Sequence, residues 1–239
     1  FSLGLLYREI GETDLALTHF LKAEELNPAS SKLAEELGNY YFDQGNFKEA
    51  QKRFLRTNLN SVGKLANLGI IAKNEERYVQ AEEYFRAAIE KEPNAILWAH
   101  LGDVLFRLNR EKQADQAYQT ALNYDPEDFE ALYNLGTLYA RFDRISEAIS
   151  LFLRAEKIRP ERADVQYNLA MLMDQQENFT QAQVRYLRAL QYGSDRAYLH
   201  LRLAFLFASQ SETDQSLMHL KVALEKDPER SVPLVLDQL

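Results

Sequence analysis

The stretch "LYNLG", Leu132–Gly136, appears again as "LANLG" at Leu65–Gly69 and as "QYNLA" at Gln166–Ala170. A leucine followed by a glycine or alanine is suited to close packing between two helices. The asparagine in the middle of each copy is polar, so packing does not explain it. The recurrence of this stretch indicates that the chain is built from repeats.

The small residue that follows leucine recurs at spacings of 34, 31, 33, 34, 34 and 34 residues. These residues are Gly4, Gly38, Gly69, Gly102, Gly136, Ala170 and Ala204. Each is followed by another small residue 12 positions later and by a large ring or leucine four positions after that. Proline closes five of the units, at Pro28, Pro93, Pro126, Pro160 and Pro228. Self-similarity at this period indicates an array of helical repeats.

Within one unit the apolar residues have the spacing of two amphipathic helices. The stretch "FEALYNLGTLYARFD", residues 129–143, places Leu132, Leu135 and Leu138 on one stripe. The stretch "ISEAISLFLRAEKI", residues 145–158, forms a second stripe with Ile149 and Phe152. A short polar break separates the two, so each unit is predicted to be a helix hairpin. The two small residues let the helix backbones approach, the ring fills the adjacent space, and proline ends the second helix.

This pattern of Leu-Gly, a following aromatic residue, Ala, aromatic, Ala and Pro resembles the tetratricopeptide repeat (TPR) family through essentially the whole chain. Trp98 stands where that family often has tryptophan, and we expect it in the core. The resemblance implies an all-α fold, an α-solenoid of about seven hairpins that forms a right-handed superhelix with a concave groove. We expect the solenoid to cover residues 1–230, with residues 231–239 as a capping helix or the start of further sequence. The expected units are approximately 1–30, 31–61, 62–94, 95–128, 129–162, 163–196 and 197–230.

Two units depart from the pattern. The 31-residue spacing loses three residues around "NLNSVG", residues 58–63, which predicts a shortened second helix or turn in the second unit. The sixth unit ends in "QYGSD", residues 191–195, where Gly193 is predicted to cap the helix in place of proline. The sequence begins at Phe1 without a methionine, and we interpret it as a fragment or a processed form.

Composition excludes several classes of function. The 239 residues carry 36 acidic and 28 basic side chains, and this net charge of −8 argues against nucleic-acid binding. No apolar run approaches the roughly 20 residues of a membrane helix, so we expect no direct membrane insertion. The absence of cysteine excludes disulfides and thiolate metal sites. We expect a soluble protein whose compartment stays open, with the cytoplasm favoured and the periplasm as an alternative.

The sequence contains none of the motifs that mark phosphate loops, nucleophile elbows or zinc proteases. Of the four histidines, His200 takes the same place in its unit as Trp98, which predicts a packed role. His19 and His219 lie beside the repeated large residues of second helices and are not expected to bind metal. We therefore predict a protein that is not an enzyme, with no catalytic residues, no cofactor and no metal.

The family resemblance implies that one stripe of each first helix lines the groove. By the repeat phase this stripe carries polar and aromatic residues that we predict to bind a partner. The candidates are Asn39, Asn67, Lys73, His100, Asp103, Arg107, Tyr133, Asn134, Arg141, Tyr167, Asn168 and Arg202.

The asparagines suggest how an extended peptide would be held. An asparagine amide offers donors and an acceptor, so it pairs with peptide N–H and C=O groups whatever the peptide sequence. Packed helices lie about 8–10 Å apart, and three residues of extended peptide span about 10 Å. A row of asparagines, one per repeat, could therefore follow an extended chain. TPR-like peptide binders, including the repeat region of the nucleocytoplasmic sugar transferase, use such rows of asparagine. The alternative is that asparagine is simply common at this position of TPR sequences.

His100 interrupts the row, although a neutral imidazole also offers one donor and one acceptor. Tyr133 and Tyr167 occupy adjacent units, where they would either flank an apolar partner side chain or cover the groove floor. Some TPR domains clamp an acidic chaperone tail, but Glu35, Ile96 and His100 stand where basic residues are needed. We reject that clamp for this chain.

The most direct interpretation is an adaptor that binds a peptide or helix of a partner protein in its groove. Two alternatives stay open. In the first, the chain is the substrate-recognition region of a larger enzyme such as a glycosyltransferase. In the second, it is a scaffold that associates with itself.

Overall fold

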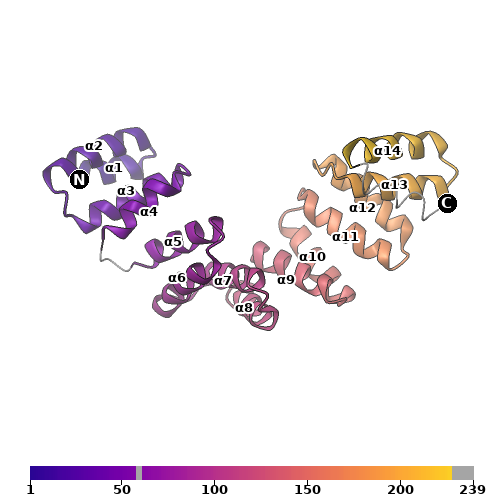
Figure 1. Cartoon of the computed structure of the whole chain (residues 1–239), viewed down its shortest axis with the longest axis horizontal. Coiled ribbons are helices and arrows are strands. Elements are labelled where there is room, and N and C mark those ends of the chain that lie inside the picture. Colours follow the sequence, from indigo (N-terminus) through magenta and orange to yellow (C-terminus); the bar gives the residue numbers. More distant parts are fainter. Residues whose placement is uncertain (58–60, 228–239) are drawn as a thin grey trace. The chain divides into compact units, whose positions relative to one another are not determined.

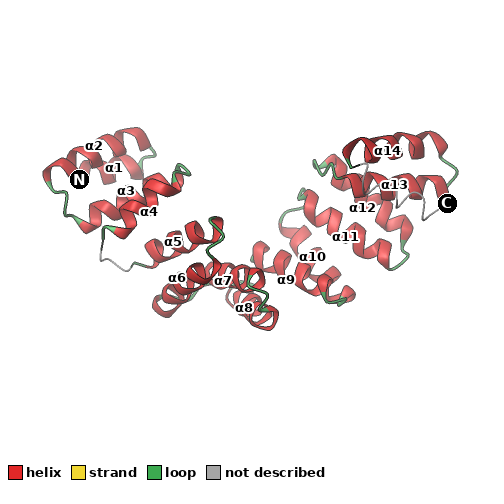
Figure 2. Cartoon of the chain, viewed as in Figure 1, coloured by secondary structure: helices red, strands yellow, loops and turns green. Residues whose placement is uncertain are grey.

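Helices account for all the regular structure in the residues that the computed structural model describes, 1–57 and 61–227 (Figures 1 and 2). The predicted all-α fold is confirmed. The helices within these ranges are α1 (Ser2–Glu9), α2 (Thr13–Leu26), α3 (Ser31–Asp43), α4 (Phe47–Leu55), α5 (Val62–Asn74), α6 (Tyr78–Lys91), α7 (Ala95–Arg107), α8 (Glu111–Tyr124), α9 (Phe129–Arg141), α10 (Ile145–Ile158), α11 (Ala163–Gln175), α12 (Phe179–Gln191), α13 (Ala197–Ser209) and α14 (Thr213–Lys226).

Consecutive helices pack in pairs, from α1 with α2 to α13 with α14, and each pair is one hairpin of the predicted repeat. The chain divides into two compact units. Unit 1, Phe1–Pro126, holds α1–α8, and unit 2 begins at Glu127 and holds α9–α14. In each unit, successive hairpins contact their neighbours, which is the packing of a helical-repeat solenoid.

The break between the two helices of a hairpin is a Schellman turn, in which the chain reverses through a left-handed residue. In the second hairpin Gly45 has a φ of 71°. Its N–H donates to the carbonyl of Phe42 at 2.9 Å, and the N–H of Asn46 donates to the carbonyl of Tyr41 at 2.8 Å. These bonds satisfy carbonyls at the end of the first helix, so a three-residue break suffices to turn the chain.

The contact inside each of the first five hairpins joins a glycine of the first helix to a ring of the second. A Cβ atom added to Gly38 would lie 2.5 Å from the ring of Phe54, and one added to Gly102 would lie 2.6 Å from the ring of Tyr118. Both rings are buried. The sequence predicted that the small residue brings two backbones together, but the atoms nearest to it belong to the ring. The glycine makes room for the aromatic side chain.

Both predicted departures from the repeat are confirmed. Helix α4 has 9 residues, whereas α6 in the next hairpin has 14. Helix α12 ends at Gln191, and Gly193 follows with a φ of 94°. Its N–H donates to the carbonyl of Leu190 at 2.9 Å, so this glycine ends the helix without a proline. The capping helix expected at residues 231–239 lies outside the described residues.

The role of the glycine is tested by two substitutions in one helix. Gly69 lies against the ring of Phe85, where an added Cβ would meet ring atoms at 2.7 Å, whereas a Cβ on Gly63 would meet nothing within 4 Å. We expect Gly69→Ala to destabilise the chain by about 1–3 kcal/mol, because the ring must shift. Gly63→Ala should be neutral or stabilising by up to about 1 kcal/mol, because alanine is the better helix former. Urea unfolding of both variants measures the difference, and equal changes would contradict the packing role.

Candidate protein-binding face

In unit 1 the first helices bring two predicted residues together. Asn67 on α5 donates from Nδ2 to Oδ1 of Asn39 on α3 at 3.1 Å. Both side chains are half-buried. The bond fixes the two amides in one orientation and leaves the second N–H of Asn67 and the amino group of Asn39 as donors. Neighbouring asparagines of the predicted row therefore form a pair across adjacent hairpins.

His100 on α7 lies against the preceding hairpin. Its ring stacks on Phe85 of α6, with 5.3 Å between the ring centroids. Burial, and next to it the charge of Lys73, lowers the pKa of His100 from 6.5 to about 4, against the opposing charge of Asp103. The imidazole is therefore neutral near pH 7, with one donor and one acceptor.

The charged candidates of unit 1 form one cluster. Lys73 Nζ lies 2.8 Å from Oδ2 of Asp103, and Arg107 Nε lies 3.8 Å from Oδ1 of the same carboxylate. The Lys73 and Asp103 side chains are 21% and 23% exposed, whereas that of Arg107 is 61% exposed. Because the lysine and aspartate neutralise each other, Arg107 carries the accessible charge of this cluster.

In unit 2 the two tyrosines are held by internal contacts. The Tyr133 hydroxyl accepts a hydrogen bond from Nδ2 of Asn168 at 3.2 Å. Tyr167 is 7% exposed, and the guanidinium of Arg196 lies 4.4 Å from its ring centroid. Of the two roles considered for the tyrosines, the burial of Tyr167 fits a residue that covers the floor of the face. Tyr133 is half-buried and stays accessible at its edge.

Asn134 on α9 differs from the other asparagines. Its side chain is half-buried and makes no hydrogen bond to any part of the chain that the structure describes. Its donors and acceptor are therefore available to a partner. Arg141, at the end of the same helix, is exposed.

Arg202 on α13 has a structural partner that the sequence interpretation missed. Its guanidinium binds Asp174 of α11 through two bonds, Nε to Oδ2 at 2.6 Å and Nη2 to Oδ1 at 2.8 Å. The Tyr186 hydroxyl donates to the same carboxylate at 3.1 Å, and the Asp174 side chain is only 6% exposed. Two-point binding of this kind is strong and directional, so Arg202 ties two hairpins together.

The predicted packing of His200 is confirmed. The side chain is buried between Asp195, whose Oδ1 lies 2.8 Å from Nε2, and His219, whose Nδ1 lies 2.9 Å from Nδ1 of His200. In the described ranges no group of three or more such side chains, these included, is arranged so that it could hold a metal ion.

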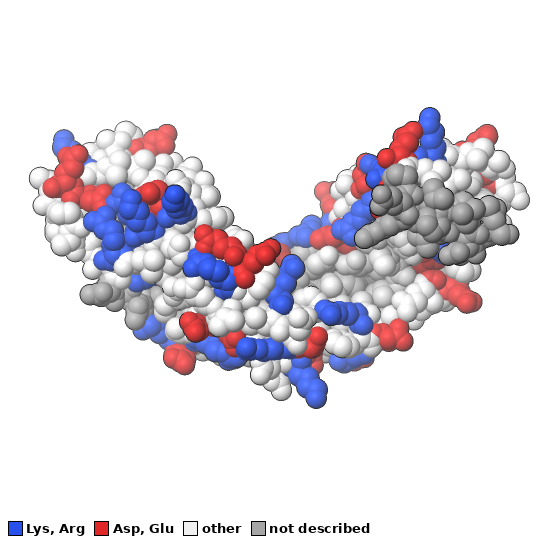
Figure 3. Space-filling model, in the orientation of Figure 1, with Lys and Arg blue, Asp and Glu red and all other residues white. Residues whose placement is uncertain are grey.

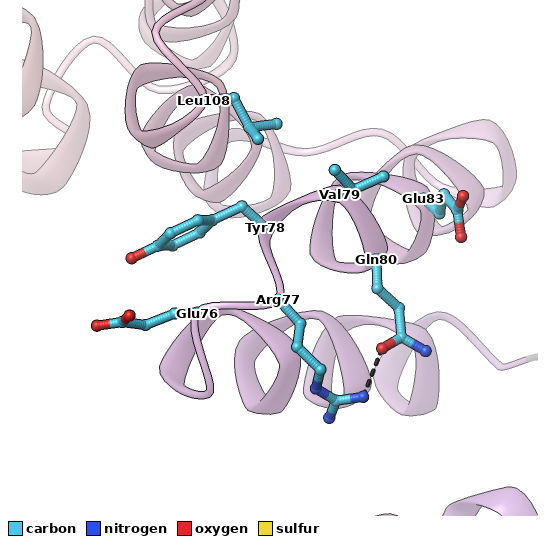
Figure 4. Close-up of a pocket in the computed structure, with 7 residues that line it drawn as sticks. All are labelled: Glu76, Arg77, Tyr78, Val79, Gln80, Glu83 and Leu108. Carbon is cyan, nitrogen blue, oxygen red and sulfur yellow. Dashed lines mark hydrogen bonds between the residues drawn. The ribbon is translucent and has the colours of Figure 1, made fainter.

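A pocket of about 530 Å³ lies at the turn between α5 and α6. In Figure 4, Leu108 from the end of α7 lies above Tyr78 and Val79, and these three make its apolar side. Arg77 donates a hydrogen bond to Gln80 at the opposite edge. The pocket is open to solvent, and none of the candidate binding residues lines it.

Charges of both signs are interspersed over the surface shown in Figure 3. Many of them pair between neighbouring hairpins, as Arg110 does with Glu82 at 2.8 Å. Among the described helices none is both long enough and apolar enough to cross a bilayer.

Family comparison agrees with the hairpin repeat. Models described as tetratricopeptide repeat match residues 1–57, 67–115 and 129–162, and a model described as TPR repeat matches residues 102–141. The chain belongs to the tetratricopeptide repeat family.

Several curated proteins resemble parts of the chain. Superkiller protein 3 of Schizosaccharomyces pombe is 29% identical over 150 residues, which are 57% of this chain and 11% of that protein. Human protein O-mannosyl-transferase TMTC3 is 27% identical over 141 residues, 50% of this chain and 15% of the enzyme. The peroxisomal targeting signal receptor of Candida albicans is 39% identical over 70 residues, 29% of this chain and 12% of the receptor. The chain thus spans less than a sixth of each of these relatives.

Solved structures share the fold at low identity. PilF of Pseudomonas aeruginosa superposes with a TM-score of 0.79 at 19% identity, covering 87% of this chain and 97% of PilF. The TPR protein YrrB has a TM-score of 0.60 at 23% identity, covering 75% of this chain and 95% of YrrB. At these identities the similarity shows the fold.

The environment of His100 predicts a pH dependence of stability. As the pH falls from 7 to 5, the unfolded imidazole, with a pKa near 6.5, takes up a proton that the folded one, with a pKa of about 4, does not. Folding is therefore expected to lose about 1–2 kcal/mol over this range through His100. Urea unfolding at pH 7 and pH 5, compared with His100→Gln, isolates the contribution. An equal loss in both proteins would show that His100 does not cause it.

Proposed function

We propose that this chain is a non-enzymatic TPR scaffold that holds a segment of a partner protein against the face formed by its first helices. The observation that carries the proposal is the set of amides on that face. Asn39 and Asn67 are oriented by each other, and the Asn134 amide makes no hydrogen bond to the described residues. Half-buried amides of this kind bind the peptide backbone without demanding a particular sequence.

The geometry suits an extended segment within each unit. Neighbouring first helices lie about 8–10 Å apart, which matches three residues of an extended chain. In unit 1 the segment would meet Asn39, Asn67 and the neutral His100, and in unit 2 Asn134 and the Tyr133–Asn168 pair. A face held rigid by internal bonds loses little conformational entropy on binding.

The comparisons support a protein ligand. YrrB is described as a TPR protein with an unusual peptide-binding site, and the Candida albicans relative is a receptor for a peroxisomal targeting signal. The cluster around Asp103 and the exposed Arg107 and Arg141 favour a partner segment of mixed charge.

A second candidate function is the substrate-recognition region of a larger enzyme. Half of this chain resembles part of protein O-mannosyl-transferase TMTC3, and this similarity favours the second candidate. In that case the same face would hold the enzyme's protein substrate. Self-association through this face is a further alternative, and sedimentation over a concentration range that shows only monomer would reject it.

The proposal predicts that the triple variant Asn67/Asn134/Asn168→Ala folds but binds poorly. Each lost hydrogen bond is worth about 0.5–1.5 kcal/mol, so capture of the bound partner should fall by about tenfold or more. The measurement is quantitative mass spectrometry of proteins crosslinked to the chain in native lysate, with thermal unfolding as the folding check.

A matched control, Gln51/Gln181/Gln215→Ala, removes three amides from the second helices and should leave capture unchanged. If the asparagine variant retains both its melting temperature and its partner, the three asparagines do not contribute to binding and the proposal is wrong. If both triple variants lose the partner equally, binding does not depend on the first-helix face.

A further inference from the structure

Two buried imidazoles meet inside the hairpin formed by α13 and α14, the last two helices labelled in Figure 1. Nδ1 of His200 on α13 lies 2.9 Å from Nδ1 of His219 on α14, and the two residues are 7% and 5% exposed. His219 also stacks on the ring of Phe207, with the two ring planes 3° apart. The histidine pair is therefore part of the packing that holds α14 on α13.

The two histidines occupy repeat positions that hold other pairs in the preceding hairpins. From the second hairpin onwards the pairs, each 19 residues apart, are Ala34–Arg53, Leu65–Tyr84, Trp98–Ala117, Leu132–Leu151, Gln166–Arg185 and His200–His219. Leu132 and Leu151 are both buried, whereas Trp98, which was expected in the core, is only partly buried. The last pair differs from the others because both of its side chains titrate near neutral pH.

The hydrogen bonds of the pair limit how many protons it can hold. Nε2 of His200 lies 2.8 Å from Oδ1 of Asp195, in the turn before α13. Hydrogen bonds from Lys226 and His200 hold the pKa of Asp195 below its usual range, so this carboxylate is ionised and Nε2 donates to it. The bond between the two Nδ1 atoms needs one proton and one lone pair. If both rings became imidazolium ions, both Nδ1 atoms would carry protons and the bond would be lost.

The surroundings of the pair provide no charge that would stabilise a second imidazolium. Asp195 is already shared between His200 and Lys226, and His219 makes no bond to a carboxylate of the described residues. Tyr186 of α12 and Tyr198 of α13 stay neutral, because burial raises the pKa of both hydroxyls. The other basic side chains of α12, α13 and α14 are bound to carboxylates, namely Arg185 and Arg188 to Glu156, Arg202 to Asp174, and Lys221 to Glu225.

We propose that the His200–His219 pair is a pH-sensitive switch, which holds α14 on α13 at neutral pH and releases it in acid. Burial, and next to it His200, lowers the pKa of His219 below 6.5. As the pH falls below about 6.5, the open hairpin therefore takes up a proton that the closed one excludes, and the closed form loses stability. The switch depends on the contact between α13 and α14, so it does not rest on the proposed binding of a partner by the asparagines.

Amide hydrogen exchange of the full chain at pH 7 and pH 5, followed by mass spectrometry of peptides, tests the switch. Rates corrected for the intrinsic effect of pH give the equilibrium for local opening. Excluding one proton changes this equilibrium by up to about tenfold per pH unit below about 6.5. We expect opening of α13–α14 to increase about tenfold or more at pH 5, and opening of α9–α10, with Leu132 and Leu151, to change little. No increase in α13–α14, or an equal increase in both hairpins, would overturn the proposal.

A double substitution assigns the effect to the pair. His200→Leu/His219→Leu gives α13–α14 the leucine pair of α9–α10, so its opening should no longer depend on pH more than that of α9–α10. His19→Leu is the matched control, because His19 has the repeat position of His219 but stacks on Tyr7 instead of a second histidine. This control should keep the response of α13–α14 to acid. Persistence of that response in the double variant, or its loss in the control, contradicts the role of the pair.

The unaltered chain offers a further test that does not depend on the folding of a variant. With nitrogen-15 in the histidines, NMR distinguishes protonated from unprotonated ring nitrogens of His200 and His219. We expect one of the two Nδ1 atoms to carry a proton at pH 7, and both rings to become imidazolium only as α13–α14 loses its protection from exchange. Two imidazolium rings in a hairpin that is as well protected as at pH 7 would show that the pair is not a switch.

Discussion

The packing of an aromatic ring on a glycine inside each of the first five hairpins is the contact on which the other features depend. Phe54 and Phe85 are fully buried because Gly38 and Gly69 leave no Cβ in their way. The ring fixes how the second helix is rotated against the first. Because the contact recurs along the chain, successive hairpins have similar geometry. Each first helix therefore presents the same stripe, and that stripe carries the asparagines.

The repeat phase in the sequence predicted more than the helices. It placed Gly38 against the second helix and identified the shortened α4 and the helix end at Gly193, because these depend on local spacing and turn chemistry. The ion pairs between adjacent repeats could also have been predicted. Asp174 with Arg202 and Lys73 with Asp103 stand 28 and 30 residues apart, close to one period, with opposite charges.

The state of each candidate residue could not be predicted in the same way. Asn67, Asn134 and Asn168 share one repeat position, yet one donates to Asn39, one makes no bond to the described residues and one donates to Tyr133. These differences depend on side-chain rotamers and on the neighbour that each amide reaches. In a periodic chain the repeated residues specify the fold, and the exceptions mark where its surface differs.

The proposed function requires a partner segment to lie against the first helices, and site-specific photo-crosslinking shows whether it does. Benzoylphenylalanine would replace Asn134 on α9 or, in a second protein, Val184 on α12, which is 48% exposed in the same unit. We predict that position 134 crosslinks one defined peptide segment of a partner and that position 184 does not. Equal crosslinking of that segment from both positions, or crosslinking from 184 alone, would exclude the first-helix face as the binding surface.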